Sequence, residues 1–284
     1  MDELTQMRWP QTGPLRAGSF IVTLFGDIVA PRGGEVGIRD IITFCAPLGL
    51  SETLIRTAMS RLVAAGQVRG LRQGRRSFYA LTEAARIEYA QAGDVIYGTP
   101  SVSEWRFLCF PEGGATQQVA ALAEPGFVVI SDMFALGPAR GACPVGAVAF
   151  AARPEGSIAG LRAMVAQLWP LDGLAKSYEG FLTFSRQIAK TDYPSPAAAL
   201  ALRVILVHTY REIALRDPQL VPEALPEHWP GHAARKEFAR LYLHLSPDAD
   251  SAVGTMFAAA SGPLARVTPQ TRARYDTLRN LVSA

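Results

Sequence analysis

Hydroxyl and guanidinium side chains gather on one side of a helix-like segment in the first third of the chain. They belong to Ser51, Thr53, Arg56, Thr57, Ser60 and Arg61. The apolar residues between them recur at helical spacing, which predicts a buried opposite face. These are Ile55, Ala58, Met59, Leu62 and Val63. Short hydroxyls and arginines on an exposed helix face suit contacts to phosphates and base edges in the major groove of DNA.

A second basic group follows at the tip of a predicted hairpin. Two strand-like segments, 68–71 and 77–81, are joined through Gln73-Gly74, a sequence typical of a turn. The tip carries Arg72, Arg75 and Arg76. Residues 51–81 contain six arginines and one acid, a formal charge of +5. The hairpin arginines suit contacts to phosphates or to the minor groove.

A helix followed by a basic hairpin is the layout of a winged helix-turn-helix, in which the helix enters the major groove and the wing holds the adjacent backbone. Upstream, the sequence predicts a helix that Ser19 caps and that ends near Pro31, a second helix over 37–45 and a turn over 47–50. The helix that begins after Ser51 and would enter the major groove is the reading helix, and Ser51 suits its N-cap. Thr82 suits the N-cap of a further helix that ends near Ala92. The alternative is a solvated basic surface on an ordinary α/β domain.

Composition and charge support a folded protein with a basic N-terminal part. The 284 residues favour two or three domains. With 49% hydrophobic and 19% charged residues, the chain can build a full core, which argues against disorder. Residues 1–90 hold 11 basic and 8 acidic side chains, whereas residues 91–284 hold 17 of each. The whole excess of +3 therefore lies in the first third, which fits a basic DNA-reading part joined to a neutral body.

The cysteines and the chain start indicate the compartment. Cys45, Cys109 and Cys143 stand in apolar surroundings without a CxxC pattern, which predicts reduced, buried thiols. No apolar run reaches the length of a membrane span. The start MDELTQMRWP lacks the hydrophobic core of a signal peptide. We expect a cytoplasmic protein.

The rest of the chain alternates strand and helix signals and then becomes helical. Predicted strands cover 105–110, 127–130, 133–136 and 147–151, and predicted helices cover 115–123 and 158–168. The order strand, helix, strand, strand, helix would be ferredoxin-like if an additional strand closes it. We predict an α+β fold in five segments. They are an N-terminal arm (1–17), a winged helix domain (18–94), a linker (95–103), a ferredoxin-like middle domain (104–170) and a mostly helical C-terminal domain (171–284).

Motifs for catalysis are missing from the sequence. It contains no GxSxG elbow, no Walker loop and no GxGxxG after a strand. His228 and His232 have the spacing of two ligands on one helical turn, but Pro230 between them disfavours a regular metal-binding helix. We therefore expect no enzyme, no catalytic residues, no metal and no cofactor.

Two blocks of sequence carry a resemblance to a known family. The first comprises FIVTLFGDIVAPRGGEVGI, APLGLSETLIRTAMSRLVAAGQV and GRRSFYALT. The second is VHTYREIALRDPQLVPEALPEHWPGHAARKEFARLY, with a helix, an RDP turn, an LP…W-G segment and a further helix. Together they resemble the PaaX family, bacterial repressors of phenylacetate catabolism, over nearly the whole chain.

The resemblance implies a ligand-responsive repressor that binds double-stranded DNA. A homodimer would address two half-sites of a palindromic operator. The implied effector is an aryl-acyl-CoA, with phenylacetyl-CoA as the type case. It would release DNA by favouring an arrangement in which the reading helices are misplaced. A regulator of another pathway with a non-CoA ligand stays open.

The resemblance to this family also bears on whether the protein could be an enzyme. The family's middle domain is similar to small CRISPR-associated ferredoxin-like endoribonucleases, which place a metal-binding aspartate at the end of the first strand. Here that strand ends Phe110-Pro111-Glu112. Because a two-metal nuclease needs paired carboxylates, we expect a structural or dimerisation module. A residual nuclease or an acyl-CoA-processing enzyme is the less favoured alternative.

Four residues of the second block are candidates for ligand binding. They are His208, Arg211, Arg216 and Trp229. Arginines beside aromatic rings could hold an acyl-CoA through its phosphates and its adenine or aryl group. A structural interpretation, with Trp229 anchoring the proline-rich segment and His208 in the core, is preferred for any single residue.

Overall fold

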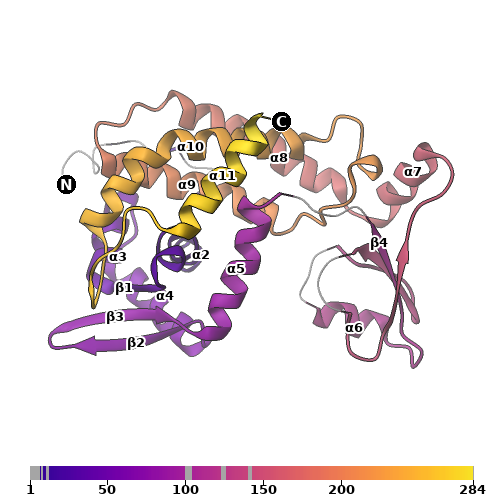
Figure 1. Ribbon diagram of the computed structural model, residues 1–284, viewed down its shortest axis with the longest axis horizontal. Helices are drawn as coiled ribbons and strands as arrows, with labels where there is room; N and C mark the ends of the chain where they lie inside the picture. Colours follow the sequence, from indigo (N-terminus) through magenta and orange to yellow (C-terminus); the bar gives the residue numbers. More distant parts are fainter. Residues whose placement is uncertain are drawn as a thin grey trace. The chain divides into compact units, whose positions relative to one another are not determined.

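The structure is a computed structural model that describes residues 7, 9–10, 13–99, 104–122, 126–139 and 143–283 (Figure 1). Residues 1–6, 8 and 11–12 of the predicted arm and 100–103 of the predicted linker lie outside this description. The chain divides into two units. The first comprises 1–99, 180–212 and 234–284, and the second comprises 100–179 and 213–233. The predicted α+β class is confirmed, with N-terminal helices and a small sheet, a four-stranded antiparallel sheet and a helical C-terminal region.

In the described part of the chain, three α-helices precede the hairpin. They are α2 (Ala17–Leu24), α3 (Ile38–Cys45) and α4 (Glu52–Ala64). α2 continues through a π turn (Phe25–Val29) and a 3-10 turn (Ala30–Arg32), which a regular helical period does not predict. The expectation that Ser19 caps α2 is wrong, because Arg16 occupies the N-cap and Ser19 lies within the helix, donating a hydrogen bond to Glu212.

The hairpin belongs to a three-stranded antiparallel sheet. Its strands are β1 (Glu35–Gly37), β2 (Val68–Gln73) and β3 (Arg76–Leu81), in the order β1-β3-β2. Gln73 pairs with Arg76, so the loop is Gly74-Arg75, one residue later than predicted. Gly74 takes a φ of 58°, which glycine adopts without steric strain. β1 was not predicted, because three residues are too short to show alternation.

Helix α5 (Glu83–Tyr97) follows the hairpin. The predicted cap is confirmed, because the Thr82 hydroxyl accepts a hydrogen bond from the N–H of Ala85 at 3.3 Å. The helix runs five residues past its predicted end at Ala92, so residues 95–97 of the expected linker are helical. It continues because Ile96 and Tyr97 are buried, which outweighs the helix-weakening effect of Gly93.

The middle of the chain forms one antiparallel sheet with two helices. The elements are β4 (Trp105–Cys109), α6 (Ala115–Ala121), β5 (Val128–Ser131), β6 (Phe134–Pro138), β7 (Val148–Ala152) and α7 (Ile158–Leu168). The strand order is β5-β6-β4-β7. Leu108, Phe110, Ala115 and Ala135 form the core between the sheet and α6.

This sheet has the strand order of a ferredoxin-like fold, with the first strand between the third and the fourth, but its element order differs. The second helix, α7, follows the fourth strand instead of preceding it. The described residues of the connection between β6 and β7, Ala139 and Cys143–Ala147, form no helix. Prolines and glycines in GPARGACPVGA disfavour a helix there.

The C-terminal helices make up most of the chain from residue 171 onward, as predicted. They are α8 (Leu171–Lys190), α9 (Pro196–Ala214), α10 (Pro230–Met256) and α11 (Pro269–Ser283), with a 3-10 turn at Pro222–Ala224 and two short strands, β8 (Ala258–Ala259) and β9 (Gly262–Pro263). No helix in the described part of the chain is long and apolar enough to cross a membrane. The prediction of three buried thiols is wrong: Cys45 is buried, Cys109 half-buried and Cys143 exposed, because Cys143 lies in the connection before β7.

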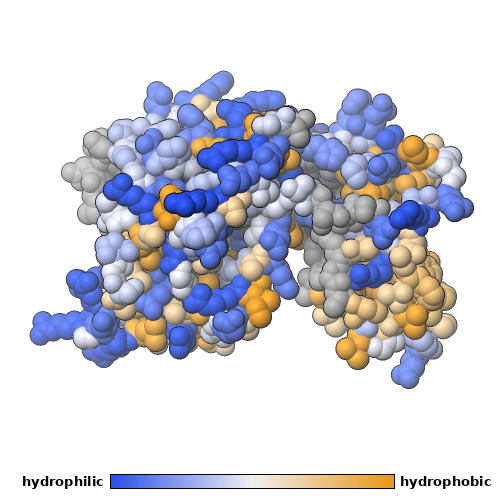
Figure 2. Space-filling model, in the orientation of Figure 1, coloured by the Kyte–Doolittle hydropathy of each residue, from blue (hydrophilic) through white to orange (hydrophobic). Residues whose placement is uncertain are grey.

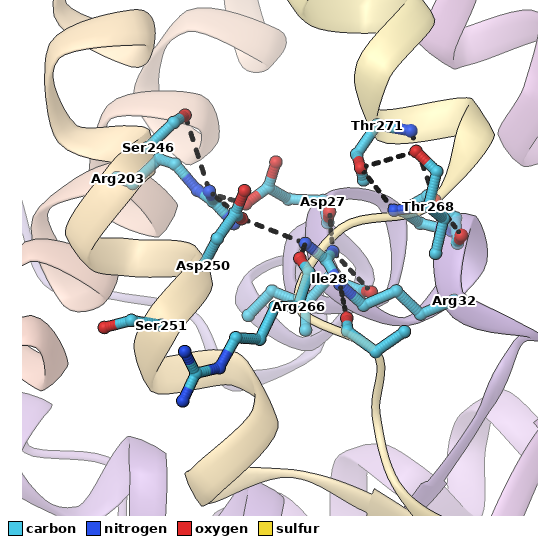
Figure 3. A network of polar contacts seen from close by, with 12 residues as sticks. Asp27, Ile28, Arg32, Arg203, Ser246, Asp250, Ser251, Arg266, Thr268 and Thr271 are labelled. Atoms are coloured by element: carbon cyan, nitrogen blue, oxygen red, sulfur yellow. Dashed lines mark hydrogen bonds and ion pairs between the residues drawn. The ribbon is translucent and has the colours of Figure 1, made fainter.

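A buried ionic cluster ties the π turn to the C-terminal helices (Figure 3). Asp27 accepts hydrogen bonds from Arg203 at 3.1 Å and from Arg274 at 3.0 Å. Asp250 accepts hydrogen bonds from Arg203 at 2.8 Å and from Arg32 at 3.0 Å. The hydroxyls of two buried tyrosines also donate to Asp27. Three arginines thus share two aspartates, and α2, α9, α10 and α11 meet at one point.

Candidate nucleic-acid interface

Helix α4 is oriented by its cap and its buried face. Gly49 takes a φ of 84° and turns the chain into the helix. The Ser51 hydroxyl accepts a hydrogen bond from the N–H of Leu54 at 3.3 Å, which confirms it as the N-cap. Ile55 and Met59 are fully buried, so the side of α4 that carries the polar residues faces outward. The prediction that Val63 is buried is wrong, because its side chain is 42% exposed near the end of the helix.

All predicted DNA-contacting side chains are exposed in the structure. Those on α4 and its cap are Ser51, Thr53, Arg56, Thr57, Ser60 and Arg61, and those on the hairpin are Arg72, Arg75 and Arg76. The exposed Arg69 on β2 extends the same basic surface. Arg69 contributes to the charge of +5 over residues 51–81, but the burial along β2 does not alternate, so no strand period marks it as a contact residue.

Glu52, the one acid in residues 51–81, forms an ion pair with Arg56 of the reading helix. The Nε of Arg56 donates to Oε1 of Glu52 at 2.7 Å, and both side chains are more than half exposed. An exposed ion pair of this kind contributes only about 0–1 kcal/mol. The guanidinium group can therefore exchange Glu52 for a phosphate or a base edge at little energetic cost.

Buried residues and strand pairing hold the hairpin that carries these arginines in place. Phe78 in the middle of β3 and Leu81 at its end are buried, and β3 pairs with β1 on its other side. The Thr82 hydroxyl donates to the carbonyl of Gly66 at 2.7 Å and closes the base of the hairpin. Figure 1 shows β2 and β3 extending away from the helices of their unit, and Figure 2 shows hydrophilic side chains at the tip. Residues 68–81 contain no acidic residue, so this extension is uniformly positive.

The candidate ligand residues fall into two groups. His208 and Arg211 belong to the first unit, and Arg216 and Trp229 to the second. His208 Nδ1 lies 2.9 Å from the Thr23 hydroxyl. Burial lowers the pKa of His208, while the Glu212 carboxylate opposes the shift, so His208 packs as a mainly neutral core side chain.

In the second unit, Trp229 packs edge-on against Tyr178, with ring centroids 5.9 Å apart. The Tyr178 hydroxyl donates to Asp217 at 2.6 Å, so the proline-rich segment is anchored as the structural interpretation predicts. Arg216 borders a cleft of about 450 Å³ together with Trp169 and Pro218.

Comparison with known proteins relates this chain to one protein family. The family description "PaaX-like protein" matches residues 16–85, from α2 through the hairpin, and "PaaX-like protein C-terminal domain" matches residues 169–254. The chain is also similar to the transcriptional repressor PaaX of Escherichia coli K12. The two are 28% identical over 260 residues, covering 83% of this chain and 82% of that repressor. The chain belongs to the PaaX-like family of transcriptional repressors.

The cap of the reading helix in this PaaX-like chain gives a direct stability prediction. Replacing Ser51 by alanine should lower the free energy of unfolding by about 1 kcal/mol, because an N–H of the first turn loses its acceptor. Urea denaturation followed by circular dichroism measures the change. Ser60→Ala is the matched control on the exposed face of the same helix and should shift stability by less than about 0.5 kcal/mol. Equal effects of the two substitutions would contradict the capping role.

Proposed function

We propose that this protein is a cytoplasmic, homodimeric repressor that binds a palindromic operator through a winged helix domain over residues 18–94. α4 would enter the major groove, and the β2–β3 hairpin would contact the adjacent backbone or minor groove. The observation that carries the proposal is the exposure of every predicted contact residue within the segment that matches the family. The relative of known function is a transcriptional repressor, which supports a regulatory role without an enzymatic one.

The middle domain, residues 104–170, serves in this proposal as a ferredoxin-like module for structure or dimerisation. One face of its sheet is covered by α6. The other face presents Phe107, Phe134 and Phe150, and Phe150 is 54% exposed. Figure 2 shows hydrophobic residues gathered over this sheet. A palindromic operator has two half-sites and so requires two copies of the chain. Such a face offers apolar area for contact between the two copies.

The effector in this proposal is an aryl-acyl-CoA of an aromatic-acid catabolic pathway, such as phenylacetyl-CoA. The support is the resemblance to the PaaX family. The test is fluorescence anisotropy with the protein's own upstream promoter DNA at two salt concentrations, with and without phenylacetyl-CoA. Salt-dependent binding that the thioester abolishes is the expected result. Binding that the thioester leaves unchanged would keep the repressor and assign it another ligand and pathway.

The reading helix and the wing should contribute differently to specificity. Arg56→Ala should weaken operator binding by about 1–3 kcal/mol and random-duplex binding much less, because base contacts carry the sequence information. Arg75→Ala should weaken both duplexes by similar factors, because phosphate contacts do not depend on sequence. Anisotropy titrations of the two duplexes measure both variants. Equal losses on operator and random DNA for Arg56→Ala would contradict this division.

A further inference from the structure

The first turn of the reading helix exposes a large apolar side chain. Leu54 is 51% exposed, whereas Ile55 and Met59 on the other side of α4 are fully buried. The N–H of Leu54 donates to the Ser51 hydroxyl, which fixes Leu54 as the third residue of the helix. Side chains of a helix tilt toward its N-terminus, and helix-turn-helix proteins place the N-terminal residues of the reading helix against base edges. Leu54 therefore lies where bases would be read.

The start of α4 does not need this leucine for its stability. The hydrophobic staple of a helix start uses the residue before the cap and the fourth helical residue, here Leu50 and Ile55, and both are buried. The third position, which Leu54 occupies, favours Glu or Gln, because they reach back to the N–H of the cap residue. A negative charge there would also complement the helix dipole. Such local preferences are most often broken at functional sites.

The surface around Leu54 fits a negatively charged partner that carries a small apolar group. Thr57 and Arg61 lie about one and two turns further along the same side of α4, and both are exposed. Residues 51–81 together carry a formal charge of +5. In the major groove of DNA, the C5 methyl group of thymine is an apolar group on a base edge, and phosphates line the groove on both sides. DNA with a thymine opposite Leu54 matches this surface.

We propose that Leu54 is a specificity-determining residue that contacts the C5 methyl group of a thymine in each operator half-site. The inference rests on the proposed repressor function, and it adds an apolar contact to the polar contacts of Arg56 and the hydroxyl groups. A glutamate in place of Leu54 would stand among phosphates, so the leucine also avoids a repulsion between like charges. Burying one methyl group contributes about 0.8 kcal/mol, so its loss should weaken binding about fourfold per half-site.

The test is a thymine-methyl scan by fluorescence anisotropy with the full-length protein. The operator comes from the protein's own upstream promoter or, where that DNA is not preferred, from selection among random duplexes. Each thymine is replaced in turn, in both half-sites, by deoxyuridine, which lacks only the methyl group. One position should cost the wild type about fourfold per half-site. The same replacement should leave the affinity of Leu54→Ala unchanged, and Leu54→Met, which keeps an apolar side chain, should retain the loss.

Two further variants separate Leu54 from other sources of the effect. Ile87→Ala removes an apolar side chain of similar exposure, 55%, from α5 and should show the methyl dependence of the wild type. Thr57→Ser removes a methyl group from the reading helix but keeps the hydroxyl. Whatever its overall affinity, Thr57→Ser should retain the dependence on the thymine methyl. Loss of that dependence in Thr57→Ser, together with its retention in Leu54→Ala, would assign the contact to the threonine and overturn the inference.

Failure of this inference and failure of the proposed function give different results. Tight operator binding that no deoxyuridine replacement weakens, or the same methyl dependence in Leu54→Ala as in the wild type, would overturn the role of Leu54 and leave the repressor standing. Absence of preference for any duplex, including after selection, would overturn the repressor function and this inference with it. Because Leu54 is half exposed, its variants should keep the circular dichroism spectrum of the wild type.

Discussion

Replacing Asp27 by asparagine should lower the free energy of unfolding by about 3–5 kcal/mol, because one of two carboxylates is lost among three buried arginines. Arg203 is completely buried and depends on Asp27 and Asp250 for its ion pairs. Without Asp27 the cluster carries more positive charge than its remaining carboxylate can balance in a medium of low dielectric constant. Urea denaturation at neutral pH, followed by circular dichroism, measures the loss.

An exposed ion pair provides the matched control for this prediction. Asp276 accepts a hydrogen bond from Arg279 at 2.8 Å, and the two side chains are 68% and 64% exposed. Asp276→Asn removes the same carboxylate charge in a solvated place and should cost less than about 1 kcal/mol. A loss at Asp27 no larger than that at Asp276 would show that the buried cluster contributes little to stability.

The pH dependence of the same variant checks the cause. Burial by itself would raise the pKa of Asp27, but the charges of Arg203 and Arg274 lower it below its ordinary value of 3.8. A carboxyl group whose pKa is lowered by folding stabilises the protein above its unfolded pKa and loses that effect as pH falls through its folded pKa. The stability difference between wild type and Asp27→Asn should therefore be constant near neutral pH and shrink once the pH falls below 3.8.

Removing the three arginines of the wing tip should give the largest functional effect. If Arg72, Arg75 and Arg76 each neutralise one phosphate, their combined replacement by alanine should weaken DNA binding by on the order of a hundredfold per protomer at 0.15 M salt. The slope of log K against log salt should fall by about 2.7 per protomer, since each lost phosphate contact removes about 0.9. Anisotropy titrations over a series of salt concentrations measure both quantities.

A second triple variant removes the same charge elsewhere. Arg153, Arg240 and Arg279 are exposed, none belongs to the hairpin, and each pairs with an acid. Their combined replacement by alanine lowers the net charge by the same amount, and the salt slope should stay nearly unchanged. If this control loses as much affinity as the wing variant, general attraction by the basic chain would explain the binding without a role for the wing.

Local sequence signals predicted the reading helix and the hairpin well. Ser51 and Thr82 cap their helices as expected, and both hairpin strands occur where alternation and β-propensity indicate them. α7 has the predicted bounds of residues 158–168. These elements are encoded by caps, turns and periodicity over a few neighbouring residues, which a single sequence displays directly.

The errors occur where distant parts of the chain decide the outcome. The three-residue strand β1 exists because it pairs with β3, whose paired residues lie 41 to 45 positions later in the chain. α5 continues past Gly93 because Ile96 and Tyr97 are buried in the first unit. The predicted strand over 147–151 closes the four-stranded sheet as β7 beside β4, where an additional strand was expected, because local propensity does not record which strands pair.

The sequence by itself thus determined the exposed basic helix, the arginine-tipped hairpin and the family, since each is written in residues close together in the chain. Only the tertiary structure decided the rest. Asp27, Arg203 and Arg274 form one buried cluster although up to 247 positions separate them. Such sites depend on packing between distant segments of the chain. A buried polar residue needs a hydrogen-bonding or charged partner, but the local periodicity of the sequence does not show which distant residue that partner is.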